Sequence, residues 1–238
     1  MINFKLLKIN QMRICYPIRE KIIPRTCPYE WRVLNRMGEE ANYGQIWATC
    51  CDQDCSYVLK YLAYNNDNTK EVILNEISIQ NECSELGLCP QIHEAWFCDE
   101  GGAIVMDLVH ITAANMFLKY KTPIVRQMIL ANIIVLLEKL HIRGIYHGDL
   151  HLHNIMIKQN GENSGEETEE ENYELKEFEY LFIDFGKGGK FERMDDSHIY
   201  RDYDQILGHL LDLCDENPDD PGLIDIVKTM KIHMKRFD

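Results

Sequence analysis

Two short apolar segments that carry acidic and amide side chains constrain this chain more than any other part of its sequence. The first runs from Tyr146 to Ile155 and contains Asp149 and, five residues later, Asn154; the second runs from Leu181 to Gly186 and contains Asp184. The apolar residues predict short buried strands, which can hold polar groups rigidly. A carboxylate can take up a hydroxyl proton, while an amide oxygen and a second carboxylate can ligate Mg²⁺. The spacing therefore suits metal-assisted phosphoryl transfer.

The bulk composition is that of a globular protein with a full core. The chain has 238 residues, of which 45% are hydrophobic and 27% are charged. No apolar run reaches the ~18 residues that span a bilayer. The N-terminal residues lack the apolar block of a secretory signal. We therefore expect a cytoplasmic protein with no membrane partner.

The formal net charge of −14 is unevenly distributed. Residues 160–179 contain nine glutamates and one lysine, whereas the first 36 residues contain eight basic and two acidic side chains. A strongly acidic chain is a poor general binder of nucleic acid, so we expect no direct nucleic-acid partner. The acidic segment is interpreted as a solvated insertion, which could recruit a basic partner.

Nine cysteines and the absence of a secretory signal predict reduced thiols. The only tight cluster lies in residues 50–55. A zinc site there would need Cys83, Cys89 or Cys98 as further ligands, and none of these stands in a C-x-x-C pair. The favoured interpretation is a β-hairpin with its turn at residues 52–54 and small thiols packed beside it.

Periodicity predicts a β-rich first part and a helical second part. Residues 1–30, which contain three prolines, are expected to form an irregular or extended arm. The elements expected next are strands at 31–37, 45–50, 56–61, 91–98 and 103–108, with a turn at 38–44 and a helix at 70–85. Further helices are expected at 112–119, 123–143, 202–214 and 222–237.

The two motif strands lie between these later helices, and the acidic segment, interpreted as a disordered loop, interrupts them. The predicted organisation is an N-terminal arm at 1–30, a β-rich lobe at 31–107, and a reduced helical lobe at 108–238 with an acidic insertion at 160–179. A site between two such lobes is plausible.

Over about residues 31–215 this pattern resembles the protein-kinase-like superfamily. The resemblance implies an α+β, bilobal fold, with an antiparallel β-sheet N-lobe that has one helix and a reduced, mainly α-helical C-lobe. It also implies ATP and Mg²⁺ as cofactors. Asp149 would be the catalytic base, and Asn154 and Asp184 would bind Mg²⁺. The Asp149–Asn154 spacing and the Asp-Phe-Gly at 184–186 are its most specific features.

The segment at 38–46 resembles the glycine-rich phosphate loop of the same superfamily. Gly44 and Ile46 match the last glycine and the following valine, Ala41 stands where the middle glycine belongs, and Gly38 lies one place early. Ala41 is small enough to let the backbone approach a phosphate. The loop is irregular and would be a weak signal by itself.

The resemblance also assigns an ion pair and an adenine pocket. Lys60, 16 residues after Gly44, resembles the strand lysine that holds the α- and β-phosphates. Glu76 matches the helix glutamate that pairs with this lysine, with Glu71 as the second candidate. Met106 would be the gatekeeper, and the backbone from Asp107 to Val109 would hydrogen-bond the base; an ordinary core strand is the alternative there.

Three departures from the family pattern bear on the substrate. Gly148 replaces the arginine that docks a phosphorylated activation loop, and His151 replaces the lysine that steadies the γ-phosphate. The chain from Asp184 to Asp204 is short and contains no Ala-Pro-Glu. The pattern is similar to atypical RIO-like kinases, to aminoglycoside- and choline-type phosphotransferases, and to kinases of large DNA viruses, for which host cytoplasm or virion would be the location.

Three function hypotheses follow from the resemblance. The first is an atypical serine/threonine protein kinase that transfers the γ-phosphate of ATP to hydroxyls of a protein substrate. The second is a small-molecule kinase, and the third is a non-catalytic pseudokinase that binds a partner. His147, His151 and His153 also have a spacing that a metal could use; the favoured interpretation is that His147 is structural and braces the loop and the Asp-Phe-Gly turn.

Overall fold

The computed structural model describes residues 20–41, 44–66, 68–159, 178–191 and 196–237. Contacts divide the chain into two compact units, residues 1–70 with 93–105 and residues 71–92 with 106–238. The N-terminal 19 residues, the hairpin tip at 42–43 and most of the acidic segment lie outside the described residues, so the predictions made for them stay predictions.

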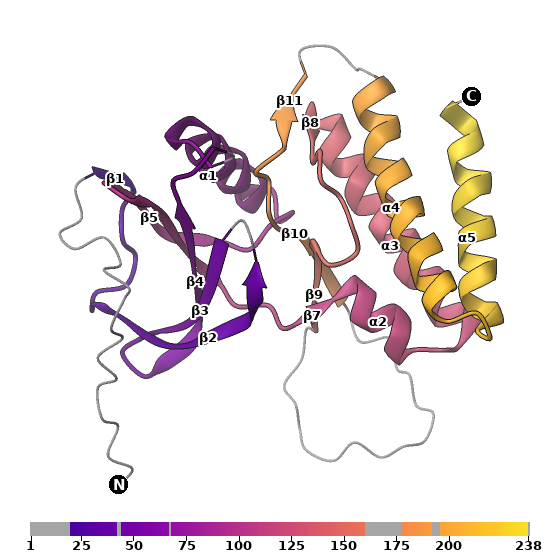
Figure 1. The fold of residues 1–238 in the computed structure, drawn as a ribbon, viewed down its shortest axis with the longest axis horizontal. Coiled ribbons are helices and arrows are strands. Elements are labelled where there is room, and N and C mark those ends of the chain that lie inside the picture. The colour runs from indigo at the N-terminus through magenta and orange to yellow at the C-terminus, as the bar shows by residue number, and fades with distance from the viewer. Residues whose placement is uncertain (1–19, 42–43, 67, 160–177, 192–195, 238) are drawn as a thin grey trace, which may run out of the picture. The chain divides into compact units, whose positions relative to one another are not determined.

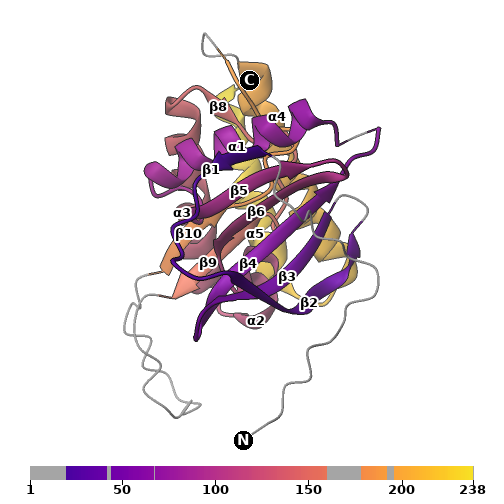
Figure 2. The same ribbon diagram turned by 90° about the vertical axis from the view of Figure 1, so that its left-hand side faces the viewer.

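The first unit is built on an antiparallel sheet whose strands lie side by side in Figure 2. The sheet has the order β1-β5-β6-β4-β3-β2. Its strands are β1 (Glu20–Ile23), β2 (Trp31–Ala41), β3 (Gly44–Cys51), β4 (Asp54–Ala63), β5 (Ile92–Cys98) and β6 (Gly101–Asp107). All strands expected after residue 30 are confirmed. The predicted arm contributes β1, which pairs with β5 at the edge of the sheet.

The β2–β3 hairpin is longer than predicted. A turn was expected over residues 38–44, but β2 continues to Ala41, and Ala41 pairs with Gly44. A shift in register between Met37 and Ala41 interrupts the pairing. Such a bulge lets a strand continue through residues that otherwise resemble a turn. The segment that resembles a phosphate loop is therefore the end of a hairpin.

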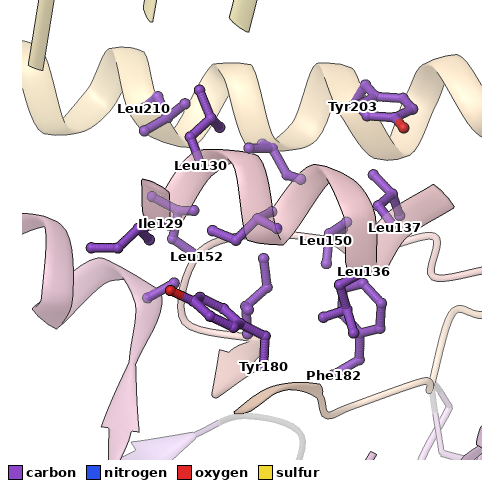
Figure 3. Packing of buried hydrophobic residues seen from close by; sticks show 14 of the residues in the cluster. Ile129, Leu130, Leu136, Leu137, Leu150, Leu152, Tyr180, Phe182, Tyr203 and Leu210 are labelled. Atoms are coloured by element: carbon purple, nitrogen blue, oxygen red, sulfur yellow. The ribbon is translucent and has the colours of Figure 1, made fainter. Parts of the chain in front are cut away.

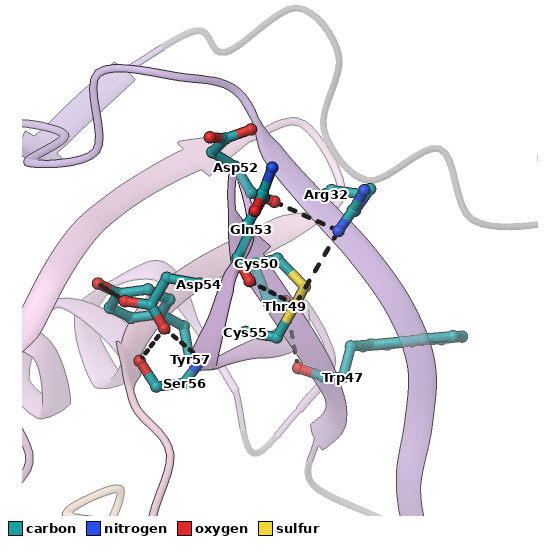
Figure 4. The surroundings of a disulfide bond; sticks show 10 residues. All are labelled: Arg32, Trp47, Thr49, Cys50, Asp52, Gln53, Asp54, Cys55, Ser56 and Tyr57. Carbon is teal, nitrogen blue, oxygen red and sulfur yellow. Dashed lines mark hydrogen bonds between the residues drawn. A yellow bond between two sulfur atoms is a disulfide. The ribbon is translucent and has the colours of Figure 1, made fainter. Parts of the chain in front are cut away.

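The β3–β4 hairpin turns at Asp52 and Gln53 and carries a disulfide (Figure 4). Asp52 has a left-handed backbone with φ of 53°, and its carbonyl accepts a 3.2 Å hydrogen bond from Arg32. Asp54 accepts hydrogen bonds from Ser56 and Tyr57, and those from Ser56 lower the pKa of the Asp54 carboxyl most. These local bonds fix the turn.

The prediction of reduced thiols is wrong for this region. Disulfides join Cys27 to Cys51 and Cys50 to Cys55. Because these sulfurs bond each other, they are not available as the zinc ligands of the alternative interpretation. The pairing depends on which strands meet in the fold, which cysteine spacing alone does not determine.

The second unit contains most of the helices (Figure 1). Its elements are α1 (Lys70–Glu85), β7 (Ile111–Thr112), α2 (Ala113–Lys119), α3 (Pro123–Ile142), β8 (Ile145–Tyr146), β9 (Ile155–Gln159), β10 (Phe178–Phe182), β11 (Gly189–Lys190), α4 (Asp196–Glu216), α5 (Pro221–Met234) and a short 3-10 helix (Lys235–Phe237). The expected helices are confirmed, except that α4 begins six residues before the predicted Asp202. Thr112 caps α2, and proline opens α3 and α5.

The core of the second unit is layered around α3 (Figure 3). Ile129 and Leu130 come from α3, Leu210 comes from α4, and Phe182 comes from β10; all belong to one buried cluster. Leu150, within the polar motif of residues 146–155, is fully buried in the same cluster. The motif is thus anchored in the core by its own apolar residues.

A buried ion pair links the ends of α3 and α5. The Arg126 side chain is fully buried, and its two terminal nitrogens donate to the Asp220 carboxylate at 2.6 and 2.8 Å. Its Nε donates to the carbonyl of Phe117 at 2.9 Å. Asp220 also caps α5 by accepting from the amide of Gly222. The guanidinium lowers the pKa of the Asp220 carboxyl through these hydrogen bonds.

The predicted fold class is confirmed: an antiparallel sheet dominates the first part of the chain and helices dominate the second. No helix among the described residues has the length and apolarity needed to cross a bilayer.

Asp220→Ala should lower the free energy of unfolding by ~3–5 kcal/mol, because it leaves the buried guanidinium of Arg126 without its carboxylate. Urea denaturation measures this change. Asp225→Ala is the matched control, since Asp225 forms an exposed pair with Lys228 in the same helix, and it should change stability by less than ~0.5 kcal/mol. Equal effects of the two variants would contradict the role given to the buried pair.

Candidate active site

Helix α4 fixes the candidate catalytic loop, residues 146–155, through two polar side chains one turn apart. The buried carboxylate of Asp202 accepts the backbone N–H groups of His147 and Gly148 at 2.9 and 2.8 Å. Gln205 accepts the N–H of Leu150 at 2.8 Å and donates to the carbonyl of Gly148 at 3.1 Å. Residues three apart on a helix share a face, so both side chains reach the same loop. They hold the backbone on either side of Asp149.

His147 braces this loop against the Asp-Phe-Gly turn, as predicted. Its Nε2 donates to the carbonyl of Ile183 at 2.9 Å, and its ring lies 4.7 Å from the ring of the fully buried Phe185. Burial lowers the pKa of His147, although the charge of Asp202 opposes this effect. The ring is therefore neutral near pH 7, and its role is structural.

Asp149, Asn154 and Asp184 are connected through short backbone contacts in the second unit. Asn154 donates from its side-chain amide to the carbonyl of Asp149 at 3.0 Å. The N–H of Ile183 donates to the carbonyl of Asn154 at 3.0 Å, which places the next residue, Asp184, beside the loop. The Asp149 side chain is 40% exposed and lies 3.0 Å from the Nζ of Lys187. The three predicted polar residues thus form one constellation.

Two features set Asp184 and Glu76 apart from ordinary surface acids. Asp184 has a φ of 68°, a left-handed conformation that costs a non-glycine residue energy and is found mostly at functional sites. A carboxylate oxygen of Glu76 and one of Asp184 both lie within 4 Å of the position of a Cβ built on Gly186. Glu76 is buried and Glu71 is exposed, so burial distinguishes the two candidates in α1 in favour of Glu76.

Part of the segment predicted to hydrogen-bond an adenine base already forms hydrogen bonds within the protein. Met106 is buried, and Gln80 Nε2 lies 3.0 Å from its sulfur. The N–H of Asp107 donates to the carbonyl of Gln91 at 3.1 Å, and the Asp107 carboxylate accepts the N–H of Gln91. A base at this segment would therefore have to use backbone groups other than the N–H of Asp107.

The first unit carries the remaining predicted residues. Lys60 is buried in β4, opposite Ile46 of β3. A Cβ on Gly44 would lie 3.6 Å from the Cε of Lys60 and 3.1 Å from Leu62, so the small residue leaves room for the lysine. Gly38 and Ala41 lie in β2, and the side chain of Ala41 is outside the described part of the structure. Lys60 and Glu76 belong to different units, and each is described within its own.

The structure explains why glycine stands at position 148. Gly148 has a φ of 77°, and a Cβ there would lie 2.2 Å from the carbonyl oxygen of Lys187. No side chain fits such a gap. The arginine of the family pattern is therefore replaced because the segment after Asp-Phe-Gly packs directly on the loop backbone.

Three histidine rings pack together beside the loop, but they are not the set of His147, His151 and His153 whose spacing a metal could use. His151, His153 and His209 have ring centroids 5.1–6.0 Å apart, and His147 is not among them. Burial is the main effect that lowers the pKa of His151 and of His209. Across the described part of the chain, no group of three or more His, Cys, Asp or Glu side chains is arranged to hold a metal ion.

Sequence reasoning missed three residues of this site: Lys187, Asp202 and Gln205. Lys187 directly follows the Asp-Phe-Gly motif, which was a usable signal. Residues 201–205 were interpreted, from the resemblance, as the start of a helix that supports the catalytic loop, but Asp202 and Gln205 were not named as the side chains that do so.

One comparison with known proteins matches this part of the chain. The model of the lipopolysaccharide kinase (Kdo/WaaP) family matches residues 103–218, slightly less than half of the chain. No curated protein sequence matches the chain significantly. The matched stretch contains Asp149, Asn154, Asp184 and Asp202. The similarity is to a family of kinases, which supports the predicted kinase-like superfamily, while the RIO-like and viral resemblances stay predictions.

Gly148→Ala should disrupt the site, because it combines a left-handed backbone with an overlap on the Lys187 carbonyl. We expect a loss of at least ~1–2 kcal/mol of stability, measured by thermal and urea unfolding. Gly208→Ala is the control, since Gly208 lies in α4 with open space around its Cβ position, and it should stabilise the protein by ~0.5–1 kcal/mol. A Gly148→Ala protein as stable as the wild type would refute the packing described here.

Proposed function

We propose that this chain is an ATP-dependent kinase that transfers the γ-phosphoryl group to a hydroxyl group. The observation that carries the proposal is the constellation of Asp149, Asn154 and Asp184, held in place by Asp202 of α4. The match of residues 103–218 to a kinase family supports it from sequence. In phosphoryl transfer the protein contributes chiefly by positioning groups and stabilising charge.

The donor set of the second unit fits Mg²⁺. The Asn154 amide donates through Nδ2 to the carbonyl of Asp149, which leaves its Oδ1 as an oxygen ligand. The Asp184 carboxylate supplies a second oxygen, and Mg²⁺ prefers oxygen ligands. Asn154 and Asp184 would hold the ion, which when bound would neutralise charge on the phosphates.

Other residues of the chain take the remaining roles in the proposed reaction. Asp149 accepts the proton of the acceptor hydroxyl or orients that hydroxyl, and its partial exposure lets an acceptor reach it. Lys60 and Glu76 take the roles of phosphate-binding lysine and its glutamate, and Met106 and Asp107 border the base. Gly38, Ala41, Gly44 and Ile46 take the role of the phosphate loop.

Serine or threonine hydroxyls of a protein are the first candidate acceptors. Asp149 is on an accessible loop, and the chemistry at such a residue is the same for any alcohol. Under this proposal the enzyme is an atypical serine/threonine kinase.

A saccharide hydroxyl is the second candidate, and two observations favour it. The matching family is named for kinases of lipopolysaccharide. The short chain between Asp184 and α4 also leaves little room for a peptide-docking platform. A panel of lysate proteins and of purified saccharides, including lipopolysaccharide, assayed for phosphate incorporation, would separate the two acceptor classes.

Asp149→Asn and Asp184→Asn should each lower phosphoryl transfer by about 10²–10⁴-fold, because they remove a hydroxyl-proton acceptor and a metal ligand. Mass spectrometry of phosphorylated products with Mg²⁺ and ATP measures the loss. Asp204→Asn, an exposed carboxylate of α4, is the control and should keep wild-type activity.

Two results would contradict the proposal. One is equal phosphate incorporation by wild type and Asp149→Asn. The other is thermal stabilisation by ATP with no turnover of any acceptor, which would instead support a non-catalytic binding module.

A further inference from the structure

The catalytic loop lacks a fixed cation at the position where the family pattern places one. His151 stands at that position, and burial lowers the pKa of its imidazole, although the charge of Asp149 opposes this effect. Its ring also packs beside His153 and His209. An imidazole whose charged form is disfavoured by burial is a poor source of the positive charge that phosphoryl transfer needs beside the equatorial oxygens.

Lys187 brings a cation to the same loop from a different segment. Its Nζ lies 3.0 Å from Oδ2 of Asp149, and the two side chains are 57% and 40% exposed. Exposed ion pairs of this kind contribute little to stability, because water competes for both groups. The ammonium group can therefore leave Asp149 for a stronger anionic partner at low cost.

The backbone of Lys187 is fixed although its side chain is exposed. The N–H of Gly188 donates to the carbonyl of Phe185 at 2.9 Å, and Asn75 donates to the carbonyl of Gly188 at 3.0 Å. The Lys187 carbonyl packs on Gly148, where no side chain intervenes. The lysine stem therefore starts from a defined point beside the catalytic loop.

We propose that Lys187 is the cation that contacts the γ-phosphoryl group during transfer, in the place of the loop lysine that His151 replaces. This inference rests on the proposed kinase function. In the resting protein Lys187 pairs with Asp149, and in the nucleotide complex its ammonium group donates to a γ-phosphoryl oxygen. The exchange also frees the Asp149 carboxylate to act on the acceptor hydroxyl.

The reaction balances without any further reactant. A bond forms between the acceptor oxygen and the γ-phosphorus, and the bond between that phosphorus and the oxygen bridging to the β-phosphate breaks. The hydroxyl proton passes to Asp149, and ADP leaves. Lys187 remains protonated throughout and is neither acid nor base.

The first test compares Lys187→Met and Lys187→Arg with the control Lys190→Met. Lys190 is three residues away and equally exposed, but its partner is Glu82. Steady-state rates of ATP turnover should show a fall in kcat of about 10²–10³-fold for Lys187→Met, the size expected when one charge-stabilising donor is removed. Lys187→Arg should keep much of the rate, and Lys190→Met should match the wild type.

A rescue variant separates this role from a structural one. Adding His151→Lys to Lys187→Met returns a cation to the loop and should restore kcat at least tenfold, with unchanged melting temperature. Failure of the rescue in a folded protein would overturn the inference. An unchanged or increased kcat in Lys187→Met would also overturn it, because the lysine would then only mask Asp149.

A binding measurement tests the inference independently of turnover. Titration calorimetry with Mg²⁺-ATP and Mg²⁺-ADP should show that Lys187→Met loses affinity for ATP relative to ADP, since only ATP has the γ-phosphate. Equal losses for both nucleotides would contradict the contact. If wild type turns over no ATP while the ATP preference still depends on Lys187, the proposed function fails and the contact stands.

Discussion

The candidate site depends on the hydrogen bonds that the carboxylate of Asp202 accepts. This carboxylate is fully buried, and a buried charge is stable only when hydrogen bonds replace the water that it has lost. Its oxygens accept the N–H groups of His147 and Gly148, and His141 Nε2 lies 2.9 Å from one of them. Moving the catalytic loop would remove the two N–H donors of His147 and Gly148 from this buried carboxylate. The position of Asp149 is therefore tied to α4 by the cost of leaving a buried carboxylate oxygen without its hydrogen bond.

The loop and the segment after Asp-Phe-Gly also constrain each other. Gly148 lets the Lys187 carbonyl approach to a distance that excludes any side chain. Asp184, three residues before Lys187, adopts a left-handed backbone, which persists only where the surroundings hold it. His147 supplies part of that hold through its bond to Ile183 and its contact with Phe185. These contacts hold the segment that carries Asp184 against the loop that carries Asp149.

Local patterns predicted most of the elements but not the contacts between distant segments. The contact of His147 with the Asp-Phe-Gly turn was expected from the family resemblance instead. Helix α1 was predicted with its observed ends, because its apolar spacing and flanking residues are all local. The strand through Gly38–Ala41 was missed, since its pairing is set by β3. The disulfides of Cys50 and Cys51 were missed for the same reason. Spacing and resemblance identified the candidate site residues Asp149, Asn154 and Asp184, whereas Lys187 contacts Asp149 from a position 38 residues away in the sequence.

The charges in the site bear on whether it would bind a free nucleotide or a magnesium–nucleotide complex. Asp149 and Asp184 are both acidic, and Lys187 offsets Asp149 in the resting protein. A bare triphosphate would meet net negative charge at short range, where repulsion is strong. Oxygen ligands from Asn154 and Asp184 favour a hard divalent cation. Under the proposed function, the residues that would repel a free polyphosphate would therefore favour its magnesium complex.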